Sequence, residues 1–185
     1  MQHSYWFRFL VYASCIFMVG IFLFNSPRFL RAQTLNQNLG ISGLPLPRFA
    51  SIKPVRVNVR VGPGSDYSII FTYKKQGLPI EIIQEYDQWR KIRDAEGDEG
   101  WVYQSLLSGK RTAITIPWQK DKTKRLILRK SPSDNAALVA EVEPNVIGKI
   151  RQCDGYWCEL NIQNTRGWLQ QSQLWGIYPD EKIKG

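Results

Sequence analysis

The chain has 185 residues, of which 43% are hydrophobic and 12% aromatic, and this apolar content excludes a chain that is disordered throughout. Its formal net charge is +9, and it contains one histidine and three cysteines. A zinc site built from several histidines is therefore excluded, and the basic charge favours anionic partners.

Residues 1–32 have the pattern of an export signal. Phe9–Phe24 is an uncharged apolar run, preceded by Arg8 and followed by Arg28 and Arg31. This order predicts an N-terminal apolar helix that serves as a cleaved signal peptide. The run is slightly short for a spanning helix, which needs about 20 residues, so a retained anchor and a buried core helix are the alternatives. We expect a periplasmic protein, or one anchored in the inner membrane that faces the periplasm.

Residues 33–54 are polar and rich in glycine and proline, which predicts an extended linker. Within it, Leu44–Arg48 favours a polyproline II conformation. Docking of this segment on its own domain is the alternative to a simple spacer.

A first β module is expected over residues 55–117. Val57–Val61 alternates apolar and polar residues, which is typical of a half-buried strand, and Gly62–Gly64 ends it. Further strands are predicted at Ile69–Tyr73, Ile80–Tyr86, Trp89–Arg93, Gly100–Tyr103 and Thr112–Ile116, with one helical turn at Gln104–Leu107. Short strands at this spacing predict a small β-barrel.

The same pattern returns in a second module, residues 118–178. Gly100–Gly109 aligns without a gap on Gly167–Gly176, and the Gly-Trp, Gln-Ser, Leu and final Gly positions are identical. Two further pairs correspond upstream, Trp89 with Trp157 and Arg60 with Arg129. Two copies predict paired domains, because a solenoid needs at least three repeats.

The second copy has diverged at its turns. Ser131–Ser133 replaces the glycines of Gly62–Gly64, so any backbone with positive φ there must change. Asn145 replaces Gly77, and asparagine is the next best residue for that conformation. Residues 179–185 are expected to form a frayed tail.

Cys153 and Cys158 flank Asp154-Gly155, a hairpin turn signal. The two cysteines would face each other across the strands, within reach of a disulfide. An oxidising compartment permits this bond, and two buried free thiols are the alternative. The expected role of the disulfide is to hold the hairpin's register, since so short a loop adds at most about 2 kcal/mol.

The pattern of Val57–Tyr67, Gly77, Trp89 and Gly100–Val102 resembles the bacterial SH3 domain family. The whole chain is similar to exported SH3-like proteins of alphaproteobacteria, and the second copy shares only a few of the family's positions. The resemblance implies an all-β chain of two tandem SH3-like barrels of the SH3b type. It also implies a role in binding cell-wall peptide or protein.

Four aromatic residues of the first module are the candidate ligand-binding residues: Tyr67, Tyr86, Trp101 and Tyr103. Aromatic rings supply contact area at low entropic cost and carry a polar edge. The alternative role for Trp101 is packing in the core or between the modules. Arg60 and Arg129 recur in both copies, which indicates a structural hydrogen bond to a loop carbonyl.

No catalytic, metal or cofactor site is expected. The single histidine is His3, inside the export signal, which leaves no Ser-His-Asp or Cys-His arrangement. The acidic cluster within Asp94–Glu99 is expected to be a solvated loop rather than a pair of catalytic carboxylates.

The expected function is therefore a non-enzymatic exported module that binds a peptide, peptidoglycan or an envelope protein. The alternatives are a structural or adaptor protein of the envelope, and a membrane-surface tether that uses the N-terminal segment. The basic cluster at Lys120–Arg125 suits anionic lipid, cell-wall carboxylates or acidic proteins, with simple solvation as the alternative. Nucleic acid is not an expected partner of an exported protein.

Overall fold

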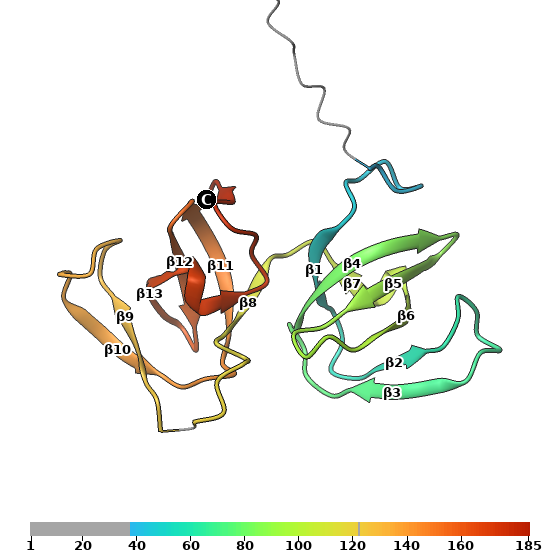
Figure 1. Cartoon of the computed structure of the whole chain (residues 1–185), viewed down its shortest axis with the longest axis horizontal. Coiled ribbons are helices and arrows are strands. Elements are labelled where there is room, and N and C mark those ends of the chain that lie inside the picture. The colour runs from blue at the N-terminus through green and yellow to red at the C-terminus, as the bar shows by residue number, and fades with distance from the viewer. Residues whose placement is uncertain (1–37, 122) are drawn as a thin grey trace, which may run out of the picture. The chain divides into compact units, whose positions relative to one another are not determined.

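A computed structural model describes residues 38–121 and 123–185 of the chain (Figure 1). Regular structure in this part is β, apart from two short 3-10 turns, which confirms the all-β expectation. The described residues all belong to one compact unit. Within the described ranges, no helix has the length and apolar character needed to cross a membrane. The expected N-terminal helix lies outside the described residues.

The first of two sheets has seven strands in the order β3-β2-β6-β5-β4-β1-β7. Their bounds are β1 Arg48–Ile52, β2 Val57–Arg60, β3 Ile69–Tyr73, β4 Pro79–Tyr86, β5 Trp89–Arg93, β6 Glu99–Tyr103 and β7 Leu107–Ser108, with the 3-10 turn η1 at Gln104–Leu106. Neighbouring strands are antiparallel.

Alternation along the strands places the core of this sheet. In β2, Val57 and Val59 are buried and Asn58 is exposed, as the period-2 pattern predicts. The buried side chains of one face form a single cluster: Ala50, Ile52, Val57, Val59, Ile80, Ile82, Ile92 and Val102. The register of β4 against β5 shifts between Ile82 and Gln84, so the alternation of β4 changes there.

The second sheet repeats this order as β10-β9-β13-β12-β11-β8-β14, and β15 pairs with β11 outside that path. The bounds are β8 Thr112–Thr115, β9 Leu126–Arg129, β10 Leu138–Val142, β11 Ile147–Asp154, β12 Trp157–Ile162, β13 Thr165–Gln170, β14 Leu174–Trp175 and β15 Lys182–Ile183, with η2 at Gln171–Gln173. A separate cluster that includes Leu128, Leu160 and Leu169 forms its core. The predicted repeat is confirmed.

The expectation that Thr112–Ile116 completes the first sheet is wrong. β8 pairs with β11 and β14 of the second sheet, and its residues are buried there. The equivalent place in the first sheet is filled by β1, which pairs with β4 and β7. Each module has an Arg-bearing strand, β2 with Arg60 in the first and β9 with Arg129 in the second. Each module therefore begins with the strand before it, β1 in the first and β8 in the second.

β1 lies inside the segment that its composition predicted to be a linker. Leu46 packs against the first core, and Ser42 donates to Glu85 through its backbone N–H at 2.8 Å. Residues 42–52 therefore dock on the first module, which was the alternative to a simple spacer. The prediction of a frayed tail is wrong at Lys182–Ile183, because this strand pairs with Cys153 and Asp154 of β11.

The turns bear out the correspondence between the copies. Gly77 has φ +76° and Asn145 has φ +62°, so asparagine does adopt the conformation of the glycine it replaces. Gly62 and Gly64 do not have positive φ. Positive φ is therefore not the reason for these two glycines. Their replacement in Ser131–Ser133 requires no change of that kind in the backbone.

The disulfide between Cys153 and Cys158 is confirmed, with a Cα–Cα distance of 4.2 Å. The two cysteines are paired directly across β11 and β12.

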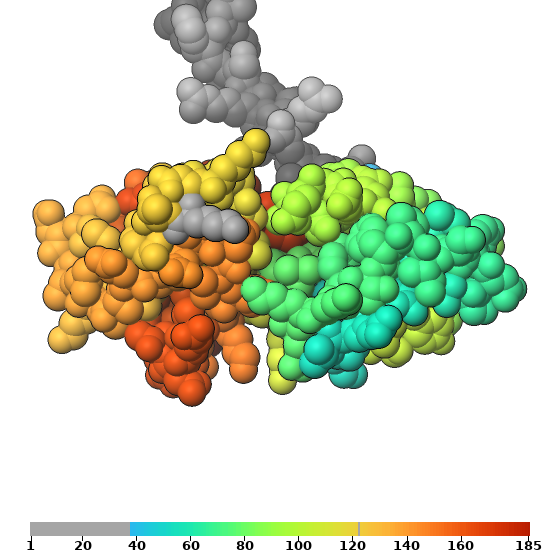
Figure 2. All heavy atoms as spheres, turned by 90° about the horizontal axis from the view of Figure 1, so that it is seen from below, coloured from blue at the N-terminus to red at the C-terminus, as the bar shows by residue number. Residues whose placement is uncertain are grey.

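An aromatic contact joins residues of the two sheets within the compact unit. The ring of Phe49 lies 5.0 Å from that of Trp175 and 4.6 Å from that of Tyr178. The hydroxyl of Tyr178 donates to Glu81 at 2.9 Å, and the guanidinium of Arg111 lies 5.5 Å from the centre of the Phe49 ring. Figure 2 shows the surface where green and orange parts of this unit approach each other.

Candidate binding groove on the first module

Two of the four predicted site residues lie in one row across three strands. Tyr86 of β4 pairs with Trp89 of β5, which pairs with Tyr103 of β6. Residues that pair directly across antiparallel strands project from the same face, so the three side chains share a surface. Tyr86 is 60% exposed and Tyr103 is 39% exposed, and the Trp89 and Tyr103 rings meet edge to face at 5.5 Å. This surface is called the aromatic row below.

A groove of about 380 Å³ adjoins the aromatic row. Trp89 and Tyr103 form one side of it, and Arg56, Asn58 and Arg60 contribute polar groups from β2 and the residue before it. Asn58 accepts a hydrogen bond from Thr72 at 2.9 Å, which orients its amide. Aromatic faces beside arginine and amide donors suit a ligand with both apolar groups and carbonyl or carboxylate oxygens.

The hairpin that carries Tyr86 and Trp89 is held from its opposite face by a buried ion pair. Arg90 contacts Glu85 at 3.2 Å and donates to the backbone oxygens of Asp87 and Trp89, both at 2.9 Å. It also donates to the side chain of Gln104 at 2.6 Å. Since these bonds lock the two-residue turn to η1, they position the aromatic row.

Glu85 is the centre of this buried network. Its side chain is 1% exposed and also accepts from Arg48 at 2.5 Å and from the hydroxyl of Ser42 at 2.7 Å. Burial acts to raise its pKa, but the hydrogen bonds from Ser42 and from Arg48 outweigh burial and lower the pKa to about 2. The carboxylate is therefore charged at neutral pH and ties the docked segment to the hairpin.

The other two predicted site residues are not part of the exposed aromatic row. Trp101 is 9% exposed, so little of its ring is available to a ligand. Trp101 precedes Tyr103 by two residues on β6 and therefore shares its face, but it pairs with Lys91 and Arg60 and is covered there. Tyr67 is exposed, and its ring lies over Gly62 and Gly64.

The glycines of the first turn are explained by Tyr67. A Cβ on Gly62 would lie 2.5 Å from the Tyr67 ring, and one on Gly64 would lie 3.1 Å from it. In the second copy Ala136 stands where Tyr67 does, and serines stand where the glycines do. Space for a ring, rather than positive φ, is what the glycines supply.

The expected structural role of the repeated arginines is confirmed. Arg60 donates to the backbone oxygen of Tyr67 at 2.5 Å, and Arg129 donates to that of Ala136 at 2.9 Å. Both bonds close the loop that follows the Arg-bearing strand.

The second module does not repeat the aromatic row. Gln170 stands where Tyr103 does, and its amide donates to Asp134 at 2.9 Å. Trp157, the counterpart of Trp89, is buried. A ligand that fits the first groove therefore lacks the same contacts on the second module.

The acidic loop serves the fold of the first module. Asp94 is buried and accepts the backbone N–H groups of Glu96 and Asp98, at 3.1 and 2.9 Å, and the hydroxyl of Tyr73 at 2.9 Å. Burial and then the nearby charge of Asp94 raise the pKa of Tyr73. Hydrogen bonds from Lys91 and then Arg93 lower the pKa of Glu99.

The profile of the family described as "Bacterial SH3 domain" matches residues 53–109 and 122–176 of this chain. The chain belongs to the bacterial SH3 domain family. The first matched region contains β2 to β7 and the second contains β9 to β14, so both modules are bacterial SH3 domains.

The chain is similar to a protein of Bacillus subtilis (strain 168), YrvJ, which is named as an N-acetylmuramoyl-L-alanine amidase. The two are 26% identical over 130 residues, which cover 68% of this chain and 25% of that protein. The chain thus spans about a quarter of the length of this relative.

Two solved structures share a more distant likeness with the paired SH3 domains. NlpC2 from Trichomonas vaginalis is 13% identical with a TM-score of 0.30, covering 70% of this chain and 48% of that one. An NlpC/P60 family protein from Bacillus cereus ATCC 10987 is 13% identical with a TM-score of 0.31, covering 69% and 56%. At these TM-scores the likeness carries no inference about function.

Sequence reasoning missed Trp89, Arg56 and Asn58 as parts of the SH3 groove. Trp89 was recognised as a repeated position and as part of the family pattern, but not as a ligand-binding residue. The two-residue turn at Asp87-Gln88 was the available signal, because so tight a turn places Tyr86 opposite Trp89.

Proposed function

We propose that this chain is a non-enzymatic binding protein of the cell envelope, whose first SH3 domain recognises the peptide part of the cell wall. The observation that carries this proposal is the aromatic row beside Arg56, Asn58 and Arg60, on a chain with two bacterial SH3 domains. Rings and amides fit a peptide with small apolar side chains, and the arginines fit its carboxylates. The amidase name of the Bacillus relative supports the cell wall as the source of that peptide.

Retention on purified sacculi at low salt tests this function. We expect the full chain to be retained and Tyr103→Ala to reduce retention by about tenfold, since an exposed aromatic at a binding surface contributes about 1–2 kcal/mol. Gln170→Ala, at the corresponding position of the second module, is the matched control and should bind as the unchanged chain does. Absence of retention, or equal loss in both variants, argues against the proposed groove.

Export to the periplasm is part of the same proposal. It is supported by the apolar run at Phe9–Phe24 and by the disulfide, which an oxidising compartment permits. N-terminal sequencing of the mature protein tests it. A start near Gln33 in the periplasmic fraction indicates cleavage, a start at Met1 in the membrane fraction indicates an anchor, and cytosolic protein contradicts both.

An adaptor role is the second candidate, favoured by the aromatic contact of Phe49 with Trp175 and Tyr178. Packed modules hold two surfaces in a fixed relation, which suits a scaffold for one partner protein. Cross-linking in cells should then trap a single stoichiometric partner, and Phe49→Ala should reduce that yield. A spread of unrelated products contradicts this role.

A further inference from the structure

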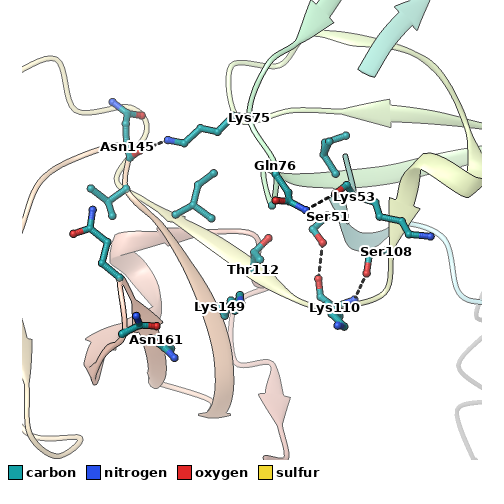
Figure 3. A pocket seen from close by; sticks show the side chains of 16 residues that line it. Ser51, Lys53, Lys75, Gln76, Ser108, Lys110, Thr112, Asn145, Lys149 and Asn161 are labelled. Carbon is teal, nitrogen blue, oxygen red and sulfur yellow. Dashed lines mark hydrogen bonds between the residues drawn. The ribbon is translucent and has the colours of Figure 1, made fainter. Parts of the chain in front are cut away.

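A second and larger groove lies between the two sheets. Its first wall is formed by β1 and the β3–β4 turn, and its second wall by β8, β11 and the β12–β13 turn. Its volume is about 840 Å³ (Figure 3). Corresponding turns of the two copies form part of its rim, and Lys75 on one donates to the backbone oxygen of Asn145 on the other at 3.3 Å. This surface is called the lysine groove below.

The charge of the lysine groove has one sign. Four lysines line it, Lys53, Lys75, Lys110 and Lys149, and its lining contains no aspartate or glutamate. Within residues 38–121 and 123–185, none of these four lysines forms an ion pair with a carboxylate. Lysines from both walls therefore give the groove a positive charge without internal neutralisation, and their combined potential attracts anions.

A buried polar atom without a partner lies at the same place. Thr112 lines the groove and is 6% exposed, and its hydroxyl has no hydrogen-bond partner among the described residues. A buried hydroxyl without a partner costs about 1–3 kcal/mol, so most such groups in proteins are satisfied. The oxygen is closed to solvent, so a bound ligand would supply the bond once the Thr112 side chain turns toward the groove.

The remaining polar side chains distinguish between classes of anion. Asn161, Gln163 and Asn164 line the second wall, and their amides make no hydrogen bond within the described ranges. An amide offers both a donor and an acceptor, which matches the N–H and C=O groups of a peptide backbone. A phosphate polymer offers acceptors only. No aromatic ring lines the groove, so a sugar or base has no stacking surface there.

We propose that the lysine groove binds an extended acidic peptide segment, whose carboxylates pair with the four lysines and whose backbone bonds with the amides and Thr112. This site is separate from the aromatic row and does not depend on the function proposed above.

Fluorescence anisotropy on the full chain, with a labelled peptide of alternating glutamate and alanine, tests the assignment. We expect binding that weakens with salt, and no binding of the matched peptide of glutamine and alanine. The double variant Lys75→Gln/Lys149→Gln should bind about tenfold more weakly, at about two- to fivefold for each exposed charge pair. Lys74→Gln/Lys130→Gln removes the same charge outside the groove and should change Kd less than about twofold.

Thr112→Val separates a built site from general attraction, because it leaves the net charge and nearly the shape unchanged. We expect it to weaken binding of the glutamate peptide by about two- to fivefold while the unbound protein unfolds at the same or higher denaturant concentration. Equal effects of the two lysine pairs, or binding of inorganic polyphosphate without the glutamate peptide, would overturn the assignment. If the assignment holds, a competition experiment identifies the source of the natural peptide. Displacement of the labelled glutamate peptide by soluble cell-wall peptides identifies the cell wall, and lack of displacement identifies an acidic protein segment.

Discussion

Gly100 lies so close to Val59 that a Cβ on the glycine would be 2.4 Å from a Val59 methyl carbon and 3.0 Å from the backbone oxygen of Arg60. The second copy has the same relationship, since a Cβ on Gly167 would be 2.4 Å from the Leu128 side chain and 3.0 Å from the backbone oxygen of Arg129. The Gly of the repeated Gly-Trp pair therefore lets β6 and β13 approach the Arg-bearing strands.

Gly100→Ala should destabilise the protein by about 2–3 kcal/mol, because the added methyl overpacks a core in which a backbone atom cannot move aside. The free energy of unfolding from urea denaturation measures this. Gly109→Ala is the control, since nothing lies within 4 Å of its Cβ position, and it should change stability by less than about 0.5 kcal/mol. Equal effects of the two substitutions would contradict the steric explanation.

Stability should depend on the charge of Glu85. Its pKa is lowered in the folded protein, so its contribution is fully present above the unfolded pKa, near pH 4–5, and is lost as pH falls toward about 2. A shift of this size corresponds to about 3 kcal/mol. The slope of unfolding free energy between pH 5 and pH 2, given by urea titrations, should shrink in Glu85→Gln.

At neutral pH, Glu85→Gln should cost about 3 kcal/mol or more, because it leaves Arg90 buried beside a neutral group. Glu99→Gln removes a partner of Lys91 and Arg93 whose side chain is 32% exposed, and it should cost less than about 1 kcal/mol. A larger effect of Glu99→Gln would show that burial does not decide the ranking.

The aromatic contact at Phe49 should couple the unfolding of the two modules. Phe49→Ala removes a buried ring from Trp175 and Tyr178 and should cost about 3 kcal/mol. We expect the intrinsic tryptophan signal to report one transition for the unchanged chain and two for the variant. Trp118→Ala, which removes an exposed ring, should keep one transition, and two transitions there would contradict the coupling.

Reduction of the Cys153–Cys158 disulfide should act locally. The loop that it closes is short, so its loss should cost about 2 kcal/mol at most. Hydrogen exchange should rise in β15, because Ile183 pairs with Cys153, and in the β11–β12 hairpin. The amides of β4 and β5 serve as internal control, and faster exchange there would point to global unfolding.

Local patterns in the sequence were sufficient to predict β2 to β6, the repeat and the disulfide, but not β1 or β15. The alternation of Val57–Val61 places two valines in the core, because side chains of a strand alternate between faces whatever the strand pairs with. Cys153 and Cys158 face each other for a similar reason, since the turn at Asp154-Gly155 sets the register of its own hairpin.

Tertiary structure alone decided which sheet receives β1 and β8, because the pairing of a strand with distant partners leaves no trace in its own periodicity. It also decided that Trp101 is covered while Tyr86, Trp89 and Tyr103 form one surface. The lysine groove has the same origin. Its lysines are scattered from residue 53 to residue 149, and only the packing of two modules brings charges so far apart in the chain to one place.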